Sequence, residues 1–258
     1  MVKCPECGKN NNDNDLFCGN CGSKMPEPKI CPYCEYESFD NTYCTKCGEK
    51  LISNESFHIK KLKDKIELAE GEYNFRLVDY YCDKLIELTP DDTWAYEKKL
   101  YSLDRNEAMR SANKLLELDP DNINANNIKG VILLDMGHDN EAMKYANKIM
   151  EVDPSDYSSY HIKGQVFLNL GQYDEALECA DKIMGLDRPV AFISYIIKGK
   201  ALIGLCKYNE AIEYAEKLIE EEDHIDGYAI KRDALKGLCQ YDEADKVNSK
   251  YLELLNSF

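Results

Sequence analysis

The stretch Gly171–Ala176 reads Gly-Gln-Tyr-Asp-Glu-Ala, and it has two close copies, at Cys206–Ala211 and Cys239–Ala244. Its glycine is suited to ending one helix in the left-handed conformation, and Asp174 is suited to capping the next. The small side chain of Ala176 lets two helices approach closely. The stretch therefore predicts a tight turn between two packed helices.

A second phrase, a lysine followed by two apolar residues, recurs five times, and two of its occurrences follow the stretches at Gly171 and Cys206. Its occurrences begin at residues 84, 114, 148, 182 and 217, which are 30, 34, 34 and 35 residues apart. The phrase occupies Lys84–Glu87, Lys114–Glu117, Lys148–Glu151, Lys182–Gly185 and Lys217–Glu220. Proline cannot continue a helix, so Asp119-Pro120 and Asp153-Pro154 predict stops. The repeating unit is helix, turn, helix and stop, in about 34 residues.

This unit resembles the tetratricopeptide repeat. In one unit Gly130, Ala142 and Pro154 fall at successive steps of twelve, as the glycine, alanine and proline of that family do. The resemblance implies a mainly α fold, an α-solenoid of about six helix hairpins. The units lie near residues 59–90, 93–120, 123–154, 157–189, 192–223 and 225–255. The second unit is short, so its first helix is expected to lose a turn.

The N-terminal segment has a different composition, with eight of the twelve cysteines in the first 47 residues. They form four Cys-x-x-Cys pairs: Cys4 and Cys7, Cys18 and Cys21, Cys31 and Cys34, and Cys44 and Cys47. Residues 1–50 hold only ten other hydrophobic side chains, too few to offset the chain entropy of ordering fifty residues. Two such pairs supply the four ligands of a tetrahedral metal site. The spacing therefore predicts two metal sites, with all eight cysteines as ligands.

The segment resembles a double zinc ribbon, because Cys-Pro-x-Cys followed by aromatic-Cys-x-x-Cys-Gly occurs twice, from Cys4 and from Cys31. The resemblance implies two Zn²⁺ ions as the only cofactors. Iron is the main rival, since four thiolates also suit iron. A disulfide framework or a redox dithiol fits the spacing less well. The expected domains are zinc ribbon 1 at 1–25, zinc ribbon 2 at 26–51, a linker at 52–58 and the repeat domain at 59–258.

Charge and missing motifs exclude several classes of function. The chain has 48 acidic and 32 basic residues, a net charge of -16, which disfavours binding to nucleic-acid phosphates. No stretch approaches the roughly 18 apolar residues of a membrane helix. The start of the sequence lacks the apolar region of a secretion signal, so a cytoplasmic location is expected. The sequence has no phosphate-binding loop and no motif of a nucleophilic or metal hydrolase, so we expect no enzyme.

The repeat resemblance also implies a function, since such arrays bind protein segments along a concave groove lined by the first helix of each unit. The lining expected here comprises Asn124, Asn127, His161, Gln165, Ile193, Ile196 and Lys200. Asn127, His161 and Lys200 are expected to point into solvent. The first hypothesis is a non-enzymatic scaffold for a neutral or basic protein or peptide, without a small-molecule substrate. The alternative is a zinc-ribbon nucleic-acid or ribosome-associated factor whose repeats recruit other proteins.

Overall fold

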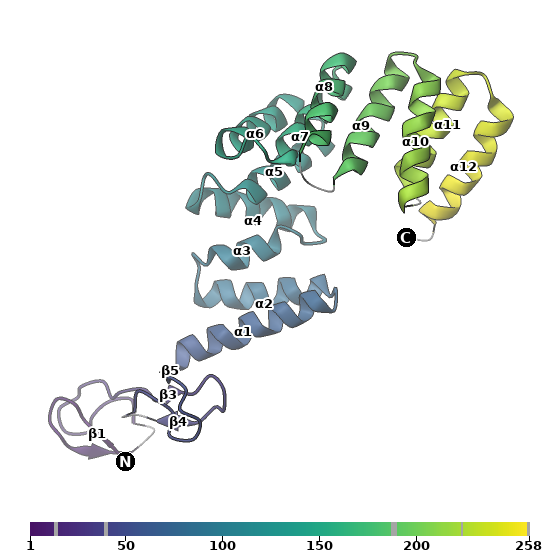
Figure 1. The fold of residues 1–258 in the computed structure, drawn as a ribbon. Coiled ribbons are helices and arrows are strands. Elements are labelled where there is room, and N and C mark those ends of the chain that lie inside the picture. The colour runs from purple at the N-terminus through teal and green to yellow at the C-terminus, as the bar shows by residue number, and fades with distance from the viewer. Residues whose placement is uncertain (13–14, 39–40, 187–189, 223, 257–258) are drawn as a thin grey trace. The chain divides into compact units, whose positions relative to one another are not determined.

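The computed structural model describes residues 1–12, 15–38, 41–186, 190–222 and 224–256. These residues form five short strands followed by twelve helices (Figure 1). Backbone contacts divide the chain into two units, Met1–Leu103 and Asp104–Phe258. The expected mainly α fold is confirmed, because successive helices form the first and the second helix of each repeat. The expected ends of two repeats, at 189 and 223, lie outside the described residues.

The strands of the first unit form two small sheets. Strands β1 (Val2–Lys3) and β2 (Asn10–Asn11) pair antiparallel. In the second sheet, β3 (Lys29–Ile30) lies between β4 (Glu37–Ser38) and β5 (Ile52–Ser53), and both pairings are antiparallel. Each sheet therefore belongs to one half of the cysteine-rich segment.

Residues 52–58, expected as a linker, form β5 and the first residues of helix α1 (Asn54–Gly71). The Ser53 side chain accepts a hydrogen bond from the Ser56 backbone N–H, so it caps the helix directly after the strand. The first helix thus begins at Asn54, five residues before the repeat start expected at 59. No flexible connection separates β5 from α1.

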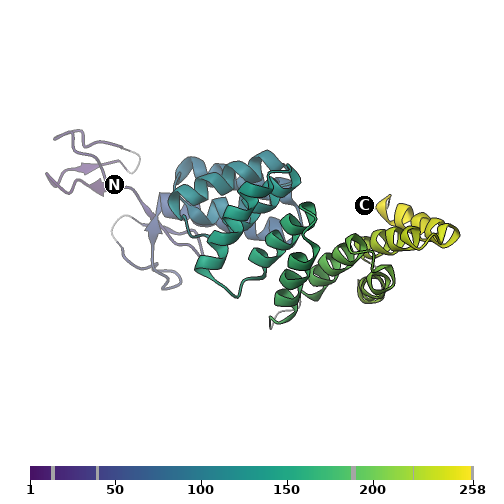
Figure 2. The ribbon, with the colours of Figure 1, turned by 90° about the horizontal axis from the view of Figure 1, so that it is seen from above.

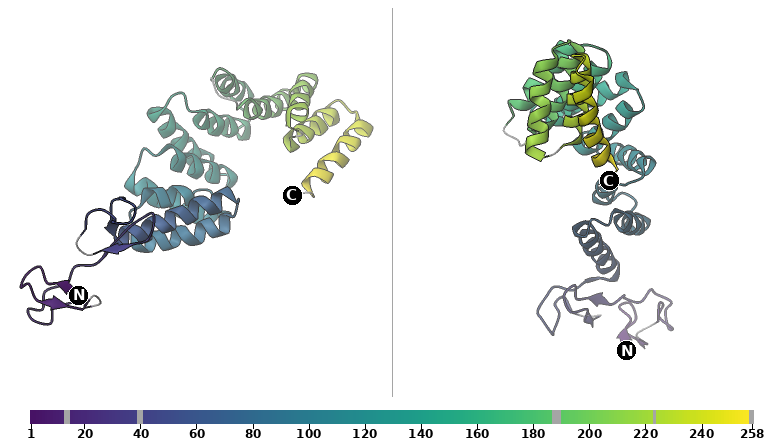
Figure 3. Two further views of the ribbon diagram at one scale, coloured as in Figure 1. Left: turned by 60° about the horizontal axis from the view of Figure 1, so that its bottom comes forward. Right: turned by 90° about the vertical axis from the view of Figure 1, so that its right-hand side faces the viewer.

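Two further helices complete the first unit, α2 (Phe75–Leu88) and α3 (Thr93–Lys99). Helices α1 and α2 lie side by side, as Figure 3 also shows, and α3 packs against α2. Their shared core contains Ile66 and Leu85, both fully buried, and Ala95 of α3. Helix α3 has only seven residues, which agrees with the shortened helix expected in the second repeat.

The second unit is built from helices alone. These are α4 (Arg105–Leu118), α5 (Ile123–Asp135), α6 (Asp139–Val152), α7 (Tyr157–Asn169), α8 (Tyr173–Met184), α9 (Ala191–Gly204), α10 (Tyr208–Glu222), α11 (Ile225–Gly237) and α12 (Tyr241–Leu255). Each helix packs against the next one, and α11 and α12 lie side by side in both Figure 1 and Figure 2. The first helices of consecutive repeats, α5, α7, α9 and α11, are also neighbours.

The turns follow the predicted chemistry in one respect and differ in another. Gly171 has a φ of 71°, the left-handed conformation that the turn requires. Cys206 and Cys239 stand at the equivalent turns with φ near 60°, where a side chain is strained. Asp174, however, caps no helix: α8 begins at Tyr173 after Gln172, which makes no side-chain cap. Asp174 lies in the first turn instead, where its negative charge suits the helix dipole.

Small residues allow the helices to pack closely. Ala142 and Ala176 are fully buried in the contacts where α6 and α8 meet their neighbours. A Cβ added to Gly130 would lie 2.7 Å from the Ile162 Cδ1 atom, so α5 and α7 approach closely at this residue. The alanine and glycine of the repeat phrase therefore set the spacing between helices.

Candidate metal centres and candidate groove

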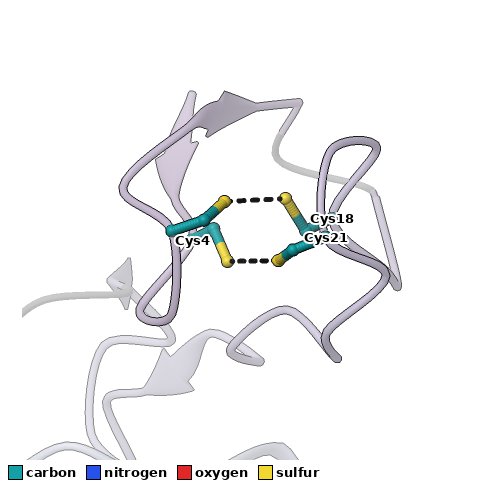
Figure 4. A group of neighbouring side chains, drawn as sticks. Cys4, Cys18 and Cys21 are labelled. Carbon is teal, nitrogen blue, oxygen red and sulfur yellow. Dashed lines mark hydrogen bonds between the residues drawn. The ribbon is translucent and has the colours of Figure 1, made fainter.

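The first group of four cysteines comes together in the small sheet of β1 and β2 and the loop that follows. All four Sγ atoms, of Cys4, Cys7, Cys18 and Cys21, lie within 4.8 Å of one another. The Cys4–Cys21 and Cys7–Cys18 sulfur pairs are each 3.5 Å apart, and Figure 4 shows the two Cys-x-x-Cys loops facing each other. A metal about 2.3 Å from four thiolates in a tetrahedron holds them about 3.8 Å apart. The group therefore has the dimensions of a four-thiolate metal site.

The second group repeats this arrangement with Cys31, Cys34, Cys44 and Cys47. The sulfur–sulfur distances are 3.4 Å for Cys31–Cys47, 3.5 Å for Cys34–Cys44 and 3.7 Å for Cys34–Cys47. In both groups, the first cysteine of each Cys-x-x-Cys pair is buried and the second is exposed. The eight cysteines predicted as ligands are thus gathered into the two predicted sets of four.

The loops that carry the cysteines share one turn. The backbone N–H of the residue after each pair donates to the carbonyl of the first cysteine, as Gly8 does to Cys4 at 2.9 Å. Gly8, Gly22 and Gly48 adopt φ values of 74° to 79°, which suit glycine. Glu35 stands at the fourth such position with φ 57° and completes the same turn. Its side chain also pairs with Lys61 of α1 at 2.7 Å, and Cys31 and Cys34 keep their places.

Backbone and side-chain donors point at the sulfur of Cys18. Backbone N–H groups of Cys21 and Asn20 lower the pKa of this thiol to about 6, which favours the thiolate that binds metal. The buried Asn11 side chain donates to the same sulfur at 3.6 Å and accepts from the Gly19 N–H at 3.1 Å. Asn11 therefore orients the ligand loop. Sequence reasoning missed this residue, because nothing in the spacing of the cysteines points to it.

Four further cysteines lie in the helical part of the chain, and two of them, Cys82 and Cys179, are buried. Burial raises the pKa of Cys82 to about 12 and that of Cys179 to about 11. Both thiols stay protonated at neutral pH and pack as small apolar side chains. Neither belongs to a group that could hold a metal among the described residues.

A hollow of about 320 Å³ lies between α5 and α7, the first helices of two consecutive repeats. Two of the predicted groove residues, His161 and Gln165, line it. The other lining residues, which sequence reasoning missed, are Val131, Leu134, Asp135 and Asn169. Val131 and Asn169 follow Asn127 and Gln165 by four residues, so continuing the i, i+4 spacing points to them, whereas Leu134 and Asp135 lie about two helical turns beyond Asn127.

The remaining predicted groove residues have varied surroundings. Asn124 is exposed, whereas Asn127 is half-buried and its Oδ1 atom has no hydrogen-bond partner within the described residues. Ile193 and Ile196 are half-buried and pack against the cores around α9. Lys200 is exposed, with its Nζ 3.5 Å from the Asp226 Oδ1 atom on α11.

His161 is half-buried, which differs from the solvent-facing position expected for it. Burial lowers the pKa of its imidazole, and the positive charge of Lys200 lowers it further. The side chain is therefore neutral at pH 7. It presents a hydrogen-bonding imidazole beside the amide of Gln165, without a charge.

Known family models match two parts of the chain. Residues 4–57 match the model described as "Double zinc ribbon", and residues 135–218 match the model described as "Anaphase-promoting complex, cyclosome, subunit 3". No curated protein matches the sequence. The cysteine-rich segment is therefore similar to double zinc ribbons over its whole length.

Solved structures give the fold of the helical part. PilW, a "widely conserved type IV pilus biogenesis factor", has a TM-score of 0.61 at 17% identity, over 74% of this chain and 91% of that one. A tetratricopeptide repeat protein from Parabacteroides merdae has a TM-score of 0.60 at 15% identity, over 76% and 79%. A thermophilic TPR protein of Thermus thermophilus has a TM-score of 0.53 at 16% identity, over 58% and 82%.

These matches agree with the repeat units described above. The chain carries a double zinc ribbon followed by a solenoid of tetratricopeptide type, as the sequence predicted. Proteins built on this fold generally bind other proteins. In the described part of the chain, no helix is both long enough and apolar enough to cross a membrane.

Proposed function

We propose that this protein is a non-enzymatic scaffold whose groove along α5, α7 and α9 binds a segment of a partner protein. The observation that carries the proposal is the hollow between α5 and α7, where amide, imidazole and aliphatic side chains meet. Asn127 lies one helical turn before Val131 of this hollow, and its buried Oδ1 atom has no hydrogen-bond partner among the described residues. Rotation of the half-buried side chain would present this oxygen to a peptide N–H, which could then donate to it.

Charge favours a neutral or basic partner segment. The whole chain has a net charge of -16, and Asp135 adds a carboxylate to the hollow. Lys200 is the basic residue of the expected lining, and it lies close to Asp226. An acidic segment would be repelled by the surrounding charge. Nucleic-acid phosphates would be repelled for the same reason.

The two ribbons would each hold one Zn²⁺ ion through four thiolates, the first by Cys4, Cys7, Cys18 and Cys21 and the second by Cys31, Cys34, Cys44 and Cys47. A closed set of four thiolates leaves no open coordination position for water or substrate, so the metal would be structural. A reducing cytoplasm would keep the thiols free to bind it. The division into two ribbons and a repeat domain follows from this assignment, with the helical part starting at Asn54.

The purified protein is expected to contain two zinc ions per chain, because two complete sets of cysteines have the dimensions of a site. Elemental analysis by plasma mass spectrometry measures both the metal and its amount. Cys7→Ser is expected to remove one equivalent, and Cys7→Ser with Cys34→Ser is expected to remove both. One equivalent in the unaltered protein, or mainly iron, would argue against the assignment.

Truncation of the groove is expected to weaken partner binding without unfolding the chain. We expect Asn127→Ala and His161→Ala to lower affinity roughly 2- to 10-fold for each hydrogen bond lost. Lys200→Glu is expected to weaken binding of a neutral segment as well, because it replaces the contact between Lys200 and Asp226 with two repelling carboxylates and so displaces side chains that line the groove. Calorimetry against a partner captured from native lysate measures these changes, and circular dichroism checks the fold.

Lys148→Ala and Lys182→Ala provide the controls for this experiment, since both lysines are exposed on second helices. They are expected to change affinity little. If they abolish binding while the groove variants bind normally, the groove is not the recognition surface. If the ribbons alone carry the affinity, or the protein binds RNA in a salt-dependent way, the alternative of a zinc-ribbon nucleic-acid factor replaces the scaffold.

A further inference from the structure

A lysine in the first helix of each repeat occupies the seventh position of the unit, counted from the expected unit starts at 59, 93, 123, 157, 192 and 225. We call these the ladder lysines: Lys65, Lys99, Lys129, Lys163, Lys198 and Lys231. Their aliphatic stems lie among the helices of the stack, and their ammonium groups reach its surface. The same residue in the same place permits a direct comparison between repeats.

Three ladder lysines bind a carboxylate on the second helix of the preceding repeat. Lys99 pairs with Asp83 of α2. The Lys198 Nζ lies 2.6 Å from the Asp181 Oδ1 atom of α8, and the Lys231 Nζ lies 2.7 Å from the Glu216 Oε1 atom of α10. Their side chains are 6%, 14% and 27% exposed, because the preceding helix covers them. Each pair therefore joins one repeat to the next.

The covering helix has a recognisable pattern at two of these junctions. Four residues before the carboxylate stands an aliphatic residue, Leu177 in α8 and Ile212 in α10, and each packs against the core of the next hairpin. One residue before the carboxylate stands a fully buried alanine, Ala180 or Ala215. The pattern aliphatic-x-x-Ala-Asp/Glu thus describes a helix that seats on the following repeat.

The first hairpin lacks a preceding repeat, and its ladder lysine is exposed. Lys65 lies 5.2 Å from the centre of the Tyr81 ring, much as Lys198 lies 5.3 Å from the Tyr214 ring. Like Lys198 it lies over a tyrosine ring, but its side chain is exposed, and no described residue supplies a carboxylate within 4.0 Å. Lys129 and Lys163 also have no carboxylate at this distance among the described residues, but α4 packs on α5 and α6 packs on α7. Lys65 differs because no described helix precedes α1.

A hollow of about 670 Å³ adjoins Lys65 on this end of the hairpin. Its apolar walls are Leu62, Tyr80, Tyr81 and Leu88, and its polar lining comprises Lys61, Lys65, Lys84, His58, Asn54, Glu27 and Glu55. Lys61 pairs with Glu35 and Lys84 pairs with Glu87, so Lys65 is the lysine of this lining that has no carboxylate within 4.0 Å among the described residues. Tyr80 is 54% exposed and Leu88 is 46% exposed, so large apolar groups face solvent here. The hollow therefore suits an apolar helix that brings one carboxylate to Lys65.

We propose that this end of the first hairpin binds an amphipathic helix of a partner protein with the pattern aliphatic-x-x-Ala-Asp/Glu. The partner helix would lie on α1 as α8 lies on α9, with its carboxylate on Lys65 and its aliphatic residue against Leu62 and Tyr81. A second copy of this chain fits less well. Its last helix, α12, carries Asp245 at the aliphatic position and Ser249 at the carboxylate position. The site lies outside the groove of the proposed function and does not depend on it.

The test uses a fluorescent peptide with the sequence of α8, Tyr173–Met184, locked in a helical form by a hydrocarbon staple on its exposed side. Titration with the full-length, metal-loaded protein, followed by fluorescence anisotropy, is expected to show saturable binding. Lys65→Glu is expected to weaken it about fivefold or more, because a like charge replaces the pairing charge. A peptide with Asp181→Asn is expected to lose a similar factor against the unaltered protein and little more against Lys65→Glu.

Lys129→Glu is the matched control, because Lys129 has the same repeat position and also lies over a tyrosine ring, that of Tyr145, at 5.0 Å. In its case α4 already packs on the helix, so the peptide has no place to bind. This variant is expected to bind the peptide normally, and circular dichroism checks both variants for folding. Tyr80→Ala is a second test of the site, because it removes an exposed ring of the hollow and is expected to weaken binding of the peptide.

Three results would overturn the proposal. The first is the absence of saturable binding, and the second is an equal loss with Lys65→Glu and Lys129→Glu. The third is concentration-dependent dimerisation, measured by light scattering, that Lys65→Glu abolishes, because the occupant would then be a second copy of the chain. None of these results bears on partner binding in the groove of α5, α7 and α9, so the two proposals fail independently.

Discussion

A strong chelator is expected to unfold residues 1–53 and to leave most of the helical circular dichroism signal in place. Apart from cysteines, the buried hydrophobic side chains among the described residues of this segment are Val2, Met25, Ile30 and Leu51. A core this small cannot order fifty residues, whereas structural zinc sites contribute about 10 to 16 kcal/mol. The helices have their own cores, such as that of Ile66 and Leu85. Tryptic digestion, with and without chelator, locates the segment that becomes susceptible.

The structure sets where this unfolding should stop. Strand β5 pairs with β3 and continues directly into α1, so the first turn of α1 is expected to fray with the ribbons. Trp94 in α3 is the only tryptophan, and it packs against the core of α1 and α2. Its fluorescence is therefore expected to stay unchanged when the ribbons unfold. Chelator saturated with zinc beforehand is the control. Loss of all helicity would mean that ribbons and helices form one cooperative unit.

Ala176→Leu is expected to destabilise the helical array by about 1 to 3 kcal/mol, because a larger side chain overpacks a close helix contact. Ala176 lies in one core cluster with Ile183 and Ile197, and all three side chains are buried. Ala142→Leu is expected to act in the same way in the contacts of α6. Thermal unfolding followed at 222 nm measures the loss as a lower Tm.

Glu175→Leu is the matched control for the alanine variants, because Glu175 is the preceding residue of α8 and is exposed. It is expected to leave Tm nearly unchanged. A Tm that moves equally for Ala176→Leu and Glu175→Leu, or for neither, would show that the assigned faces of the helix are wrong.

The repeat period predicted the fold well because it reflects packing. Ala142 and Ala176 recur at a fixed spacing since a helix meets a helix there in every unit, and both are buried. Helix ends were harder to predict. Asp174 was expected to cap α8 but lies within its first turn, because the left-handed Gly171 already reverses the chain and Gln172 precedes the helix. The start of α1 was placed too late, because the repeat pattern carries no information about the strand before it.

The sites could be predicted to different degrees. The cysteines were predicted because their spacing brings four sulfurs to one point, whereas Asn11 acts through a fold that the spacing does not reveal. In the groove, His161 and Gln165 were found but Asp135 was not, since the lining depends on how two helices are rotated against each other. The ladder lysines are visible as a period in the sequence. Their carboxylate partners lie on other helices and require the structure.

Side-chain footprinting of the full-length protein, with and without its captured partner, tests the groove most directly. Hydroxyl radicals label exposed aliphatic, aromatic and imidazole side chains, and mass spectrometry locates the labels. Partner binding is expected to protect Leu134 and His161 in the hollow between α5 and α7. The exposed rings of Phe17, Tyr33 and Tyr43 in the ribbons are expected to stay fully labelled. Protection of these three rings, with unchanged labelling of Leu134 and His161, would contradict a groove-binding scaffold and would make the ribbons the recognition element.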